Sequence, residues 1–110
     1  INCKEDLVML NIKSKEEFVE LSKEGLLVVD FYADWCGPCR MLGPVMEELA
    51  AEYENKAKFA KLNVDNVDEV ASAFRIMSIP CVVFIKDGKE VNRIVGYRPK
   101  KDFELVLESL

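Results

Sequence analysis

The chain has 110 residues and a net charge of −5, and half of its residues are hydrophobic. This length suits one compact domain, which we expect to span residues 1–110. The negative charge disfavours nucleic acid and anionic membranes as main partners, and no apolar run approaches the roughly 18 residues that a membrane helix needs. The chain contains no histidine, which excludes Ser/His triads, Cys/His proteases and histidine metal clusters.

The first two thirds of the chain alternate between strands and helices. In chain order we predict a strand at 7–12, a helix at 14–23, a strand at 26–32, a helix at 36–54, a strand at 58–64 and a short helix at 66–74. Two of these helices start at capping boxes, formed by Ser14 with Glu17 and by Asn66 with Glu69. Pro44 falls inside the longest helix, which we expect it to kink.

The last third predicts a hairpin and a closing helix. Strands at 81–85 and 91–95 flank Asp87 and Gly88, a pair typical of a tight hairpin turn. Pro99 is expected at the first position of the closing helix. Four apolar residues recur on one face of this helix: Phe103, Val106, Leu107 and Leu110. Alternating elements followed by a hairpin imply an α/β fold, with a mixed sheet and helices on both faces.

The motif WCGPC, residues 35–39, lies where the apolar strand gives way to a helix. A thiol attacks as its thiolate, and a free cysteine is only a few per cent ionised at neutral pH. If Cys36 caps the helix, unpaired N–H groups and the helix dipole stabilise its anion. Lowering a thiol pKa from about 8.5 to near 7 takes about 2 kcal/mol, of which the dipole supplies about 0.3–2 kcal/mol and a hydrogen bond from Cys39 the rest. Cys39 lies one helical turn away and can attack a mixed disulfide on Cys36.

Other interpretations of this motif are a structural disulfide, half of a zinc site and a chance pair. Zinc would need all four cysteines, including the isolated Cys3 and Cys81, and the chain lacks a second CxxC. A structural disulfide needs neither Trp35 nor Pro38 beside it. The strand-to-helix context favours redox chemistry. Four cysteines in a chain with a credible core also indicate a reducing compartment.

Asp30 interrupts the apolar strand at 26–32, where an unpaired charge is costly and the pKa of a carboxyl group rises. Six residues before Cys36, it is a candidate base for deprotonating Cys39, directly or through a water molecule. The alternative is a hydrogen-bonded structural role or an outward-facing side chain. Lys61, in the neighbouring strand, either approaches Asp30 and moderates its charge or faces solvent.

Pro80 opens the strand at 81–85, a permitted place for proline, and base rates favour a trans peptide bond before it. The adjacent Cys81 is either a small buried core residue or, if it lies near Cys36, a third thiol that competes for the mixed disulfide. Cys3, near the start of the chain, is expected to be incidental.

WCGPC, the preceding VVDFYADW, the later IPC before a strand and the closing Val95-Gly96 together resemble the thioredoxin family along essentially the whole chain. The resemblance implies the thioredoxin fold, a central five-stranded mixed sheet flanked by four helices. It also implies a cytoplasmic, monomeric protein-disulfide reductase that needs no bound cofactor or metal and is recharged by a thioredoxin reductase. Gly37-Pro38 between the thiols favours reduction over oxidation, since a histidine there would further stabilise the thiolate.

The resemblance assigns roles to single residues. Cys36 corresponds to the exposed nucleophile and Cys39 to the buried resolving thiol. Asp30 corresponds to the buried base, and Lys61 to its strand neighbour. Pro80 matches the cis-proline of the family. A flat apolar patch that binds an extended substrate strand is matched by Trp35, Gly37, Pro38, Ile79, Pro80, Val95 and Gly96.

Two positions depart from the family pattern. Cys81 stands where threonine usually follows the cis-proline, and we consider it a possible modulating thiol, open to oxidation or modification. Tyr32 replaces a tryptophan of many bacterial relatives, which we interpret as a packing change. A rival interpretation from another class is a binding module, whose partner grips the same apolar patch and leaves the redox chemistry unused.

Overall fold

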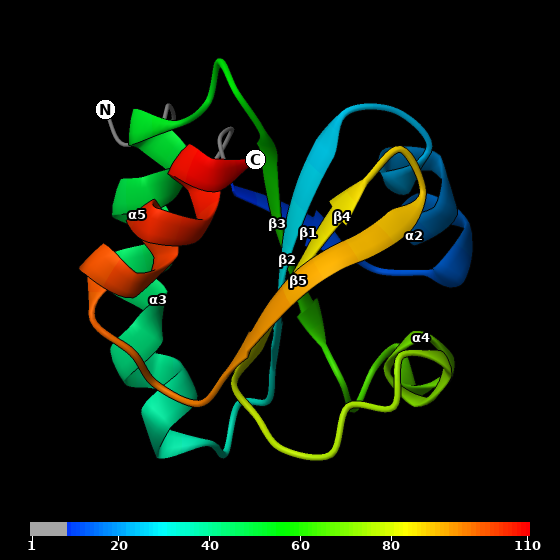
Figure 1. The fold of residues 1–110 in the computed structure, drawn as a ribbon. Coiled ribbons are helices and arrows are strands. Elements are labelled where there is room, and N and C mark those ends of the chain that lie inside the picture. Colours follow the sequence, from blue (N-terminus) through cyan, green and yellow to red (C-terminus); the bar gives the residue numbers. More distant parts are fainter. Residues whose placement is uncertain (1–8) are drawn as a thin grey trace, which may run out of the picture.

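The computed structural model describes residues 9–110, which form a five-stranded sheet and four helices (Figure 1). The elements are β1 (Met9–Ile12), α2 (Lys15–Ser22), β2 (Leu26–Tyr32), α3 (Gly37–Glu52), β3 (Lys58–Asn63), α4 (Asp68–Ala73), β4 (Cys81–Lys86), β5 (Lys89–Val95) and α5 (Lys100–Ser109). Cys3 and the first two residues of the strand predicted at 7–12 lie outside the described residues. Within residues 9–110, no helix is both long and apolar enough to cross a membrane.

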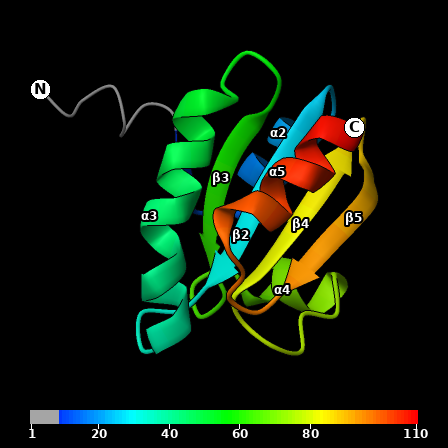
Figure 2. The same cartoon turned by 60° about the vertical axis from the view of Figure 1, so that its left-hand side comes forward.

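The sheet has the order β1-β3-β2-β4-β5. β2 runs parallel to β3, as does β1, whereas β4 is antiparallel to both β2 and β5. The two views show α3 and α5 on one face of the sheet and α2 and α4 on the other (Figures 1 and 2). The predicted mixed sheet with helices on both faces is therefore confirmed, and β2 lies at its centre.

Each face of the sheet has its own apolar core, and β2 contributes to both. Leu27 and Phe31 pack with the buried side chains of α2 and α4. Leu26 and Val28 pack with those of α3 and α5. Because successive side chains of a strand point to opposite faces, Asp30 shares the α3/α5 face with Val28. The central strand thus places a carboxyl group under the start of α3.

The predicted cap and hairpin turn form as expected. The Ser14 hydroxyl oxygen accepts a hydrogen bond from the Glu17 N–H at 3.2 Å. Asp87 and Gly88 connect β4 to β5 with positive φ angles of 49° and 88°, as a type I′ turn requires. The Asp87 carboxylate also accepts the Gly25 N–H at 2.7 Å, which ties the hairpin turn to the start of β2.

The predicted capping box at Asn66 and Glu69 is wrong. α4 begins at Asp68 and has no side-chain cap. The chain first turns around Asn63, whose carbonyl oxygen accepts the Val67 N–H at 3.0 Å. Residues 63–67 therefore form a turn, and the helix begins only after it.

Two prolines lie in or next to the helices of the α3/α5 face. Pro99 precedes α5 and is not its first helical residue, since its ψ of 154° is extended and its carbonyl oxygen accepts the Asp102 N–H at 3.0 Å. Pro44 lies inside α3, as predicted, and the helix continues to Glu52. Pro44 has no N–H for the Arg40 carbonyl, and the kink expected there stays a prediction.

Candidate active site

Cys36 and Cys39 lie at the junction between β2 and α3. Cys36 is the N-cap of α3, with extended backbone angles of −90° and 112°. Its Sγ accepts a hydrogen bond from the Cys39 N–H at 3.2 Å, and Pro38, the second residue of the helix, has no N–H to compete. The two cysteines form a disulfide, with their Cα atoms 5.2 Å apart. The predicted helix cap and the predicted pairing are both confirmed.

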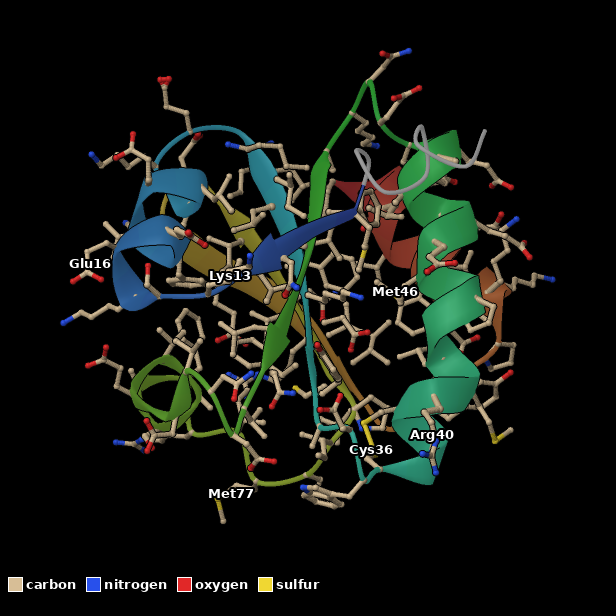
Figure 3. All side chains as sticks on the ribbon, turned by 180° about the vertical axis from the view of Figure 1, so that it is seen from behind. Lys13, Glu16, Cys36, Arg40, Met46 and Met77 are labelled. Atoms are coloured by element: carbon tan, nitrogen blue, oxygen red, sulfur yellow. A yellow bond between two sulfur atoms is a disulfide. The ribbon has the colours of Figure 1, made fainter. Side chains whose placement is uncertain are left out.

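The disulfide is covered by the segment that precedes β4. Cys36 and Cys39 are each only 5% exposed, and the Cys36 Sγ lies 3.8 Å from the carbonyl oxygen of Ile79. The expected contrast between an exposed Cys36 and a buried Cys39 is absent from this disulfide state, because Ile79 covers Cys36. Figure 3 shows Cys36 at the end of the sheet where α3 begins, with Arg40 one helical turn further on.

Asp30 lies below the disulfide on the α3/α5 face. It is buried, and no hydrogen-bond partner reaches its Oδ1 within the described part of the chain. Burial raises the pKa of Asp30 from 3.8 to about 7, although the charge of Lys61 acts in the opposite direction. A cavity of about 190 Å³ joins this carboxyl group to the resolving side of the disulfide. It is lined by Asp30, Tyr32, Ala33, Asp34, Cys39, Arg40, Gly43 and Lys61.

Lys61 lies directly beside Asp30 in the sheet. The two residues are register partners in the parallel pair of β2 and β3, so their side chains share one face. The Lys61 Nζ lies 5.9 Å from the centre of the Tyr32 ring, within cation–π range. Lys61 thus lies on the same face as Asp30, and its charge opposes the effect of burial on the pKa of that carboxyl group. Burial and the nearby Asp34 carboxylate raise the pKa of Tyr32.

Pro80 and Gly96 close the site on the opposite side of the disulfide. The Ile79-Pro80 peptide bond is cis, as the resemblance implies and against the base rate. The Pro80 carbonyl oxygen accepts the Gly96 N–H at 2.7 Å. Gly96 has a φ of +88°, a conformation that side chains other than glycine rarely adopt. These contacts bring the start of β4 and the end of β5 to the same end of the sheet as Cys36.

Several exposed apolar side chains surround this end of the sheet. Trp35 is 68% exposed, and its Nε1–H donates to the Asp65 carboxylate at 3.0 Å. Met77, two residues before Ile79, is 91% exposed and points away from the protein (Figure 3). Met77 was not predicted from the sequence, and Met41, in the first turns of α3, is also exposed. The available signal was a methionine in a predicted loop, two residues before the IPC motif at 79–81.

Cys81 does not belong to this site. Its side chain is 1% exposed and packs in the core under α2 and α4, opposite Phe31 of β2. Of the two alternatives for Cys81, the buried core residue is the one found, because the alternation of β4 turns its side chain to the α2/α4 face of the sheet. Burial also raises the pKa of the Cys81 thiol, so the core interpretation of this residue holds.

Comparisons with known proteins agree with this geometry. The thioredoxin family model matches residues 8–109. A thioredoxin of Staphylococcus aureus is 46% identical over 93 residues, which cover 84% of this chain and 89% of the relative. Among solved structures, a mutant thioredoxin from Halobacterium salinarum is 36% identical with a TM-score of 0.85, and the match covers 92% of this chain and 88% of that one. Plasmodium falciparum thioredoxin is 34% identical with a TM-score of 0.84, covering 91% of this chain and 97% of its own.

The family and the bonded pair at 36 and 39 support redox chemistry for the motif over the zinc and chance interpretations. Thioredoxins are reduced by thioredoxin reductases and act on disulfide substrates. The chain belongs to the thioredoxin family, and it is a thiol–disulfide oxidoreductase with protein-disulfide reductase activity.

Proposed function

We propose that Cys36 is the nucleophile and Cys39 the resolving thiol of this reductase. The Cys36 thiolate attacks one sulfur of a substrate disulfide, forms a mixed disulfide and expels the other substrate sulfur as a thiolate, which takes up a proton. Cys39, once deprotonated, attacks the Cys36 sulfur and releases the second substrate thiolate. The substrate gains two electrons and two protons, and the chain is left with the Cys36–Cys39 disulfide seen in the structure.

The observation that carries this proposal is the position of the Cys36 sulfur at the start of α3. The Cys39 N–H lies 3.2 Å from it, and the first N–H groups of a helix have no partners within the helix. The same N–H groups and the helix dipole, worth about 0.3–2 kcal/mol, stabilise a thiolate at this place. Cys39 lies inside the helix and lacks this advantage, which supports the resolving role.

We assign Asp30 as the base that deprotonates Cys39. Support comes from the cavity that both side chains line and from a carboxyl pKa of about 7, close to the working pH of a cellular reductase. The cavity is large enough for a water molecule to carry the proton between the two groups. Lys61 adjusts the charge of Asp30 from the neighbouring strand.

The substrate surface in this proposal surrounds Cys36. An extended substrate segment lies beside Ile79 and Pro80, where backbone groups before β4 pair with it. Apolar side chains of the substrate pack on the exposed Trp35. The remaining contacts are assigned to Gly37, Pro38, Val95 and Gly96.

The partners of the proposed cycle follow from its electron balance. Each turnover leaves a disulfide that must be reduced again, and we propose a thioredoxin reductase as the electron donor. Such a cycle needs reducing conditions, so we place the protein in the cytoplasm. We further propose that the chain acts as a monomer with one thioredoxin domain, without cofactor, metal, nucleic acid or membrane.

The test is insulin reduction coupled to NADPH and a thioredoxin reductase, with two variants. Cys36→Ser should reduce turnover to background. Cys39→Ser should retain attack but stop at the mixed disulfide, which mass spectrometry detects as a covalent adduct with the substrate. Turnover by Cys36→Ser, or a substrate adduct on the Cys39 of Cys36→Ser, would overturn the assignment. A substrate complex that survives in Cys36→Ser/Cys39→Ser with no turnover in the wild type would favour the binding module.

A further inference from the structure

The segment 74–80 carries Ile79, which lies against Cys36, and its residues 77–79 have no backbone bonds in the described part of the chain. It joins α4 to β4, and its Ile79 carbonyl oxygen lies 3.8 Å from the Cys36 Sγ. The Pro80 carbonyl, at the end of the segment, is bound to the Gly96 N–H of the β5 side. What holds the beginning of the segment therefore matters for the site.

At the beginning of the segment, the N–H groups of residues 74–76 bind carbonyl groups of α4, and Arg93 of β5 adds a contact from the sheet. A guanidinium nitrogen of Arg93 donates to the Phe74 carbonyl oxygen at 2.9 Å. Phe74 is the C-cap of α4, a six-residue helix with no basic residue in its last turn. The last carbonyl groups of a helix have no partner within it. Those of Ala71 and Ser72 accept the N–H groups of Ile76 and Arg75, and Arg93 supplies the donor for the carbonyl group of Phe74.

The orientation of Arg93 is fixed by Glu90. The guanidinium donates to both carboxylate oxygens of Glu90, at 2.5 and 2.8 Å, which is the fork geometry of a bidentate pair. Residues three apart in a regular strand point to opposite faces. The register shift in β5 restores them to one face, because Glu90 lies opposite Ile85 and Arg93 opposite Val83. The irregularity thus makes the Glu90–Arg93 pair possible.

Arg93 also lies near the other end of the segment. Its positive charge opposes the effect of burial on the pKa of the Cys81 thiol, the first residue of β4. One side chain of β5 is therefore close to Phe74 at the start of the segment and to Cys81 just after its end. The Gly96 N–H, three residues further along, adds the second fixed point.

We propose that Arg93 is a positioning residue for disulfide exchange, which holds the segment 74–80 so that Ile79 and Pro80 stay in place beside Cys36 when a protein substrate binds. This inference rests on the proposed substrate surface. Arg93 lies on the α2/α4 face, whereas Asp30 and Cys39 line the cavity on the α3/α5 face. Its loss should therefore weaken the binding of extended substrates while the chemistry of the thiol pair is retained.

The experiment compares two disulfides that differ in their need for this segment. Insulin binds along the surface, whereas 5,5′-dithiobis(2-nitrobenzoate) is a small disulfide that needs only access to Cys36. Arg93→Met keeps an unbranched apolar stem and removes the donors. We expect it to raise KM for insulin about tenfold, the loss expected for one charge-assisted hydrogen bond. The value of kcat and the rate with the small disulfide should stay within about twofold of the wild type.

Two further variants separate positioning from general effects. Arg98→Met removes an exposed arginine that pairs with Asp102 at 3.6 Å, and it should leave KM unchanged. Arg93→Lys retains one donor for the Phe74 carbonyl and should recover part of the affinity for insulin. Amide hydrogen exchange at residues 74–76, whose N–H groups are bonded to carbonyl groups of α4, should become faster in Arg93→Met and stay unchanged in Arg98→Met.

The outcomes distinguish this inference from the proposed function. An unchanged KM in Arg93→Met, or an equal loss with both disulfides, would overturn the positioning role even if Cys36→Ser is inactive. Turnover by Cys36→Ser would instead overturn the proposed function, whatever the result for Arg93. If Arg93→Met does not fold, a wild-type KM in Arg93→Lys together with unchanged exchange at residues 74–76 contradicts the inference.

Discussion

The two faces of the sheet each bury one titratable side chain near the active-site end, and the surroundings of the two side chains differ. Asp30 on the α3/α5 face and Cys81 on the α2/α4 face are both nearly inaccessible to solvent, and burial raises the pKa of each. Asp30, however, lines a cavity together with Cys39. Cys81 packs among the apolar side chains under α2 and α4, with the Arg93 guanidinium nearby, and does not line that cavity.

Asp30 and Cys81 show together that burial alone does not give a side chain a role in the chemistry. A buried acid becomes a base for exchange when a path leads from it to the group it serves, and the cavity is that path. A buried thiol without such a path behaves as a small apolar residue. The difference between the faces follows from the alternation of β2 and β4, whose register partners share a face.

The largest effect that separates the faces should be on stability. The folded pKa of Asp30, about 7, lies above the value of 3.8 for the free side chain. Below about pH 4 both states are protonated and the burial costs nothing electrostatically, whereas stability falls as the pH rises from 4 to 7 and is then level. About three pH units at 1.36 kcal/mol each amount to about 4 kcal/mol.

Asp30→Asn should therefore stabilise the disulfide form by up to about 4 kcal/mol at pH 8 and remove the decline between pH 4 and 7. Urea unfolding at a series of pH values measures both effects. Equal stability of variant and wild type at pH 8 would show that another interaction offsets the cost of burying the ionised carboxyl group.

The next effect is on turnover. In the wild type, resolution by Cys39 should become faster as the pH rises through about 7, because only the ionised Asp30 accepts a proton. Asp30→Asn should slow insulin reduction about tenfold to a hundredfold at pH 8 and lose this rise, with KM little changed. A pH profile of the variant that matches the wild type would remove the base role from Asp30.

A smaller effect is expected on the other face. Cys81→Ser places a hydroxyl group among apolar side chains, which should cost about 1 to 2 kcal/mol of unfolding free energy. Turnover should stay at the wild-type level, because the cavity and the thiol pair lie across the sheet. Denaturant unfolding and the insulin assay on the same preparation test both halves of the prediction.

The smallest effect should come from Cys81→Val, which keeps an apolar side chain of similar size. We expect a change in unfolding free energy below about 1.5 kcal/mol and unchanged turnover. The variant also loses any oxidation chemistry of this thiol. If treatment with peroxide inactivates the wild type and spares Cys81→Val, the enclosed position of Cys81 does not protect it.

Local patterns predicted those parts of the molecule that depend on neighbouring residues. The WCGPC motif after an apolar run predicted the helix cap at Cys36, and a charge inside that run predicted a perturbed Asp30. Parts that depend on distant contacts were not predictable in this way. The turn around Asn63 displaced the start of α4, and the face on which Cys81 lies depends on strand register.

The Arg93 contacts were beyond sequence reasoning for the same reason. They require an irregular register in β5 and the end of a helix nineteen residues earlier in the chain. The sequence shows only a charged residue in a strand, which more often faces solvent.

The most direct test is site-resolved alkylation of the reduced protein by iodoacetamide as a function of pH, with each cysteine followed by mass spectrometry. We expect Cys36 to react with a midpoint near pH 7, well below the value of about 8.5 for a free thiol, whereas Cys39 and Cys81 react slowly until the protein unfolds. A midpoint at or above about 8.5 for Cys36, or labelling of Cys81 as fast as that of Cys36, would contradict the account.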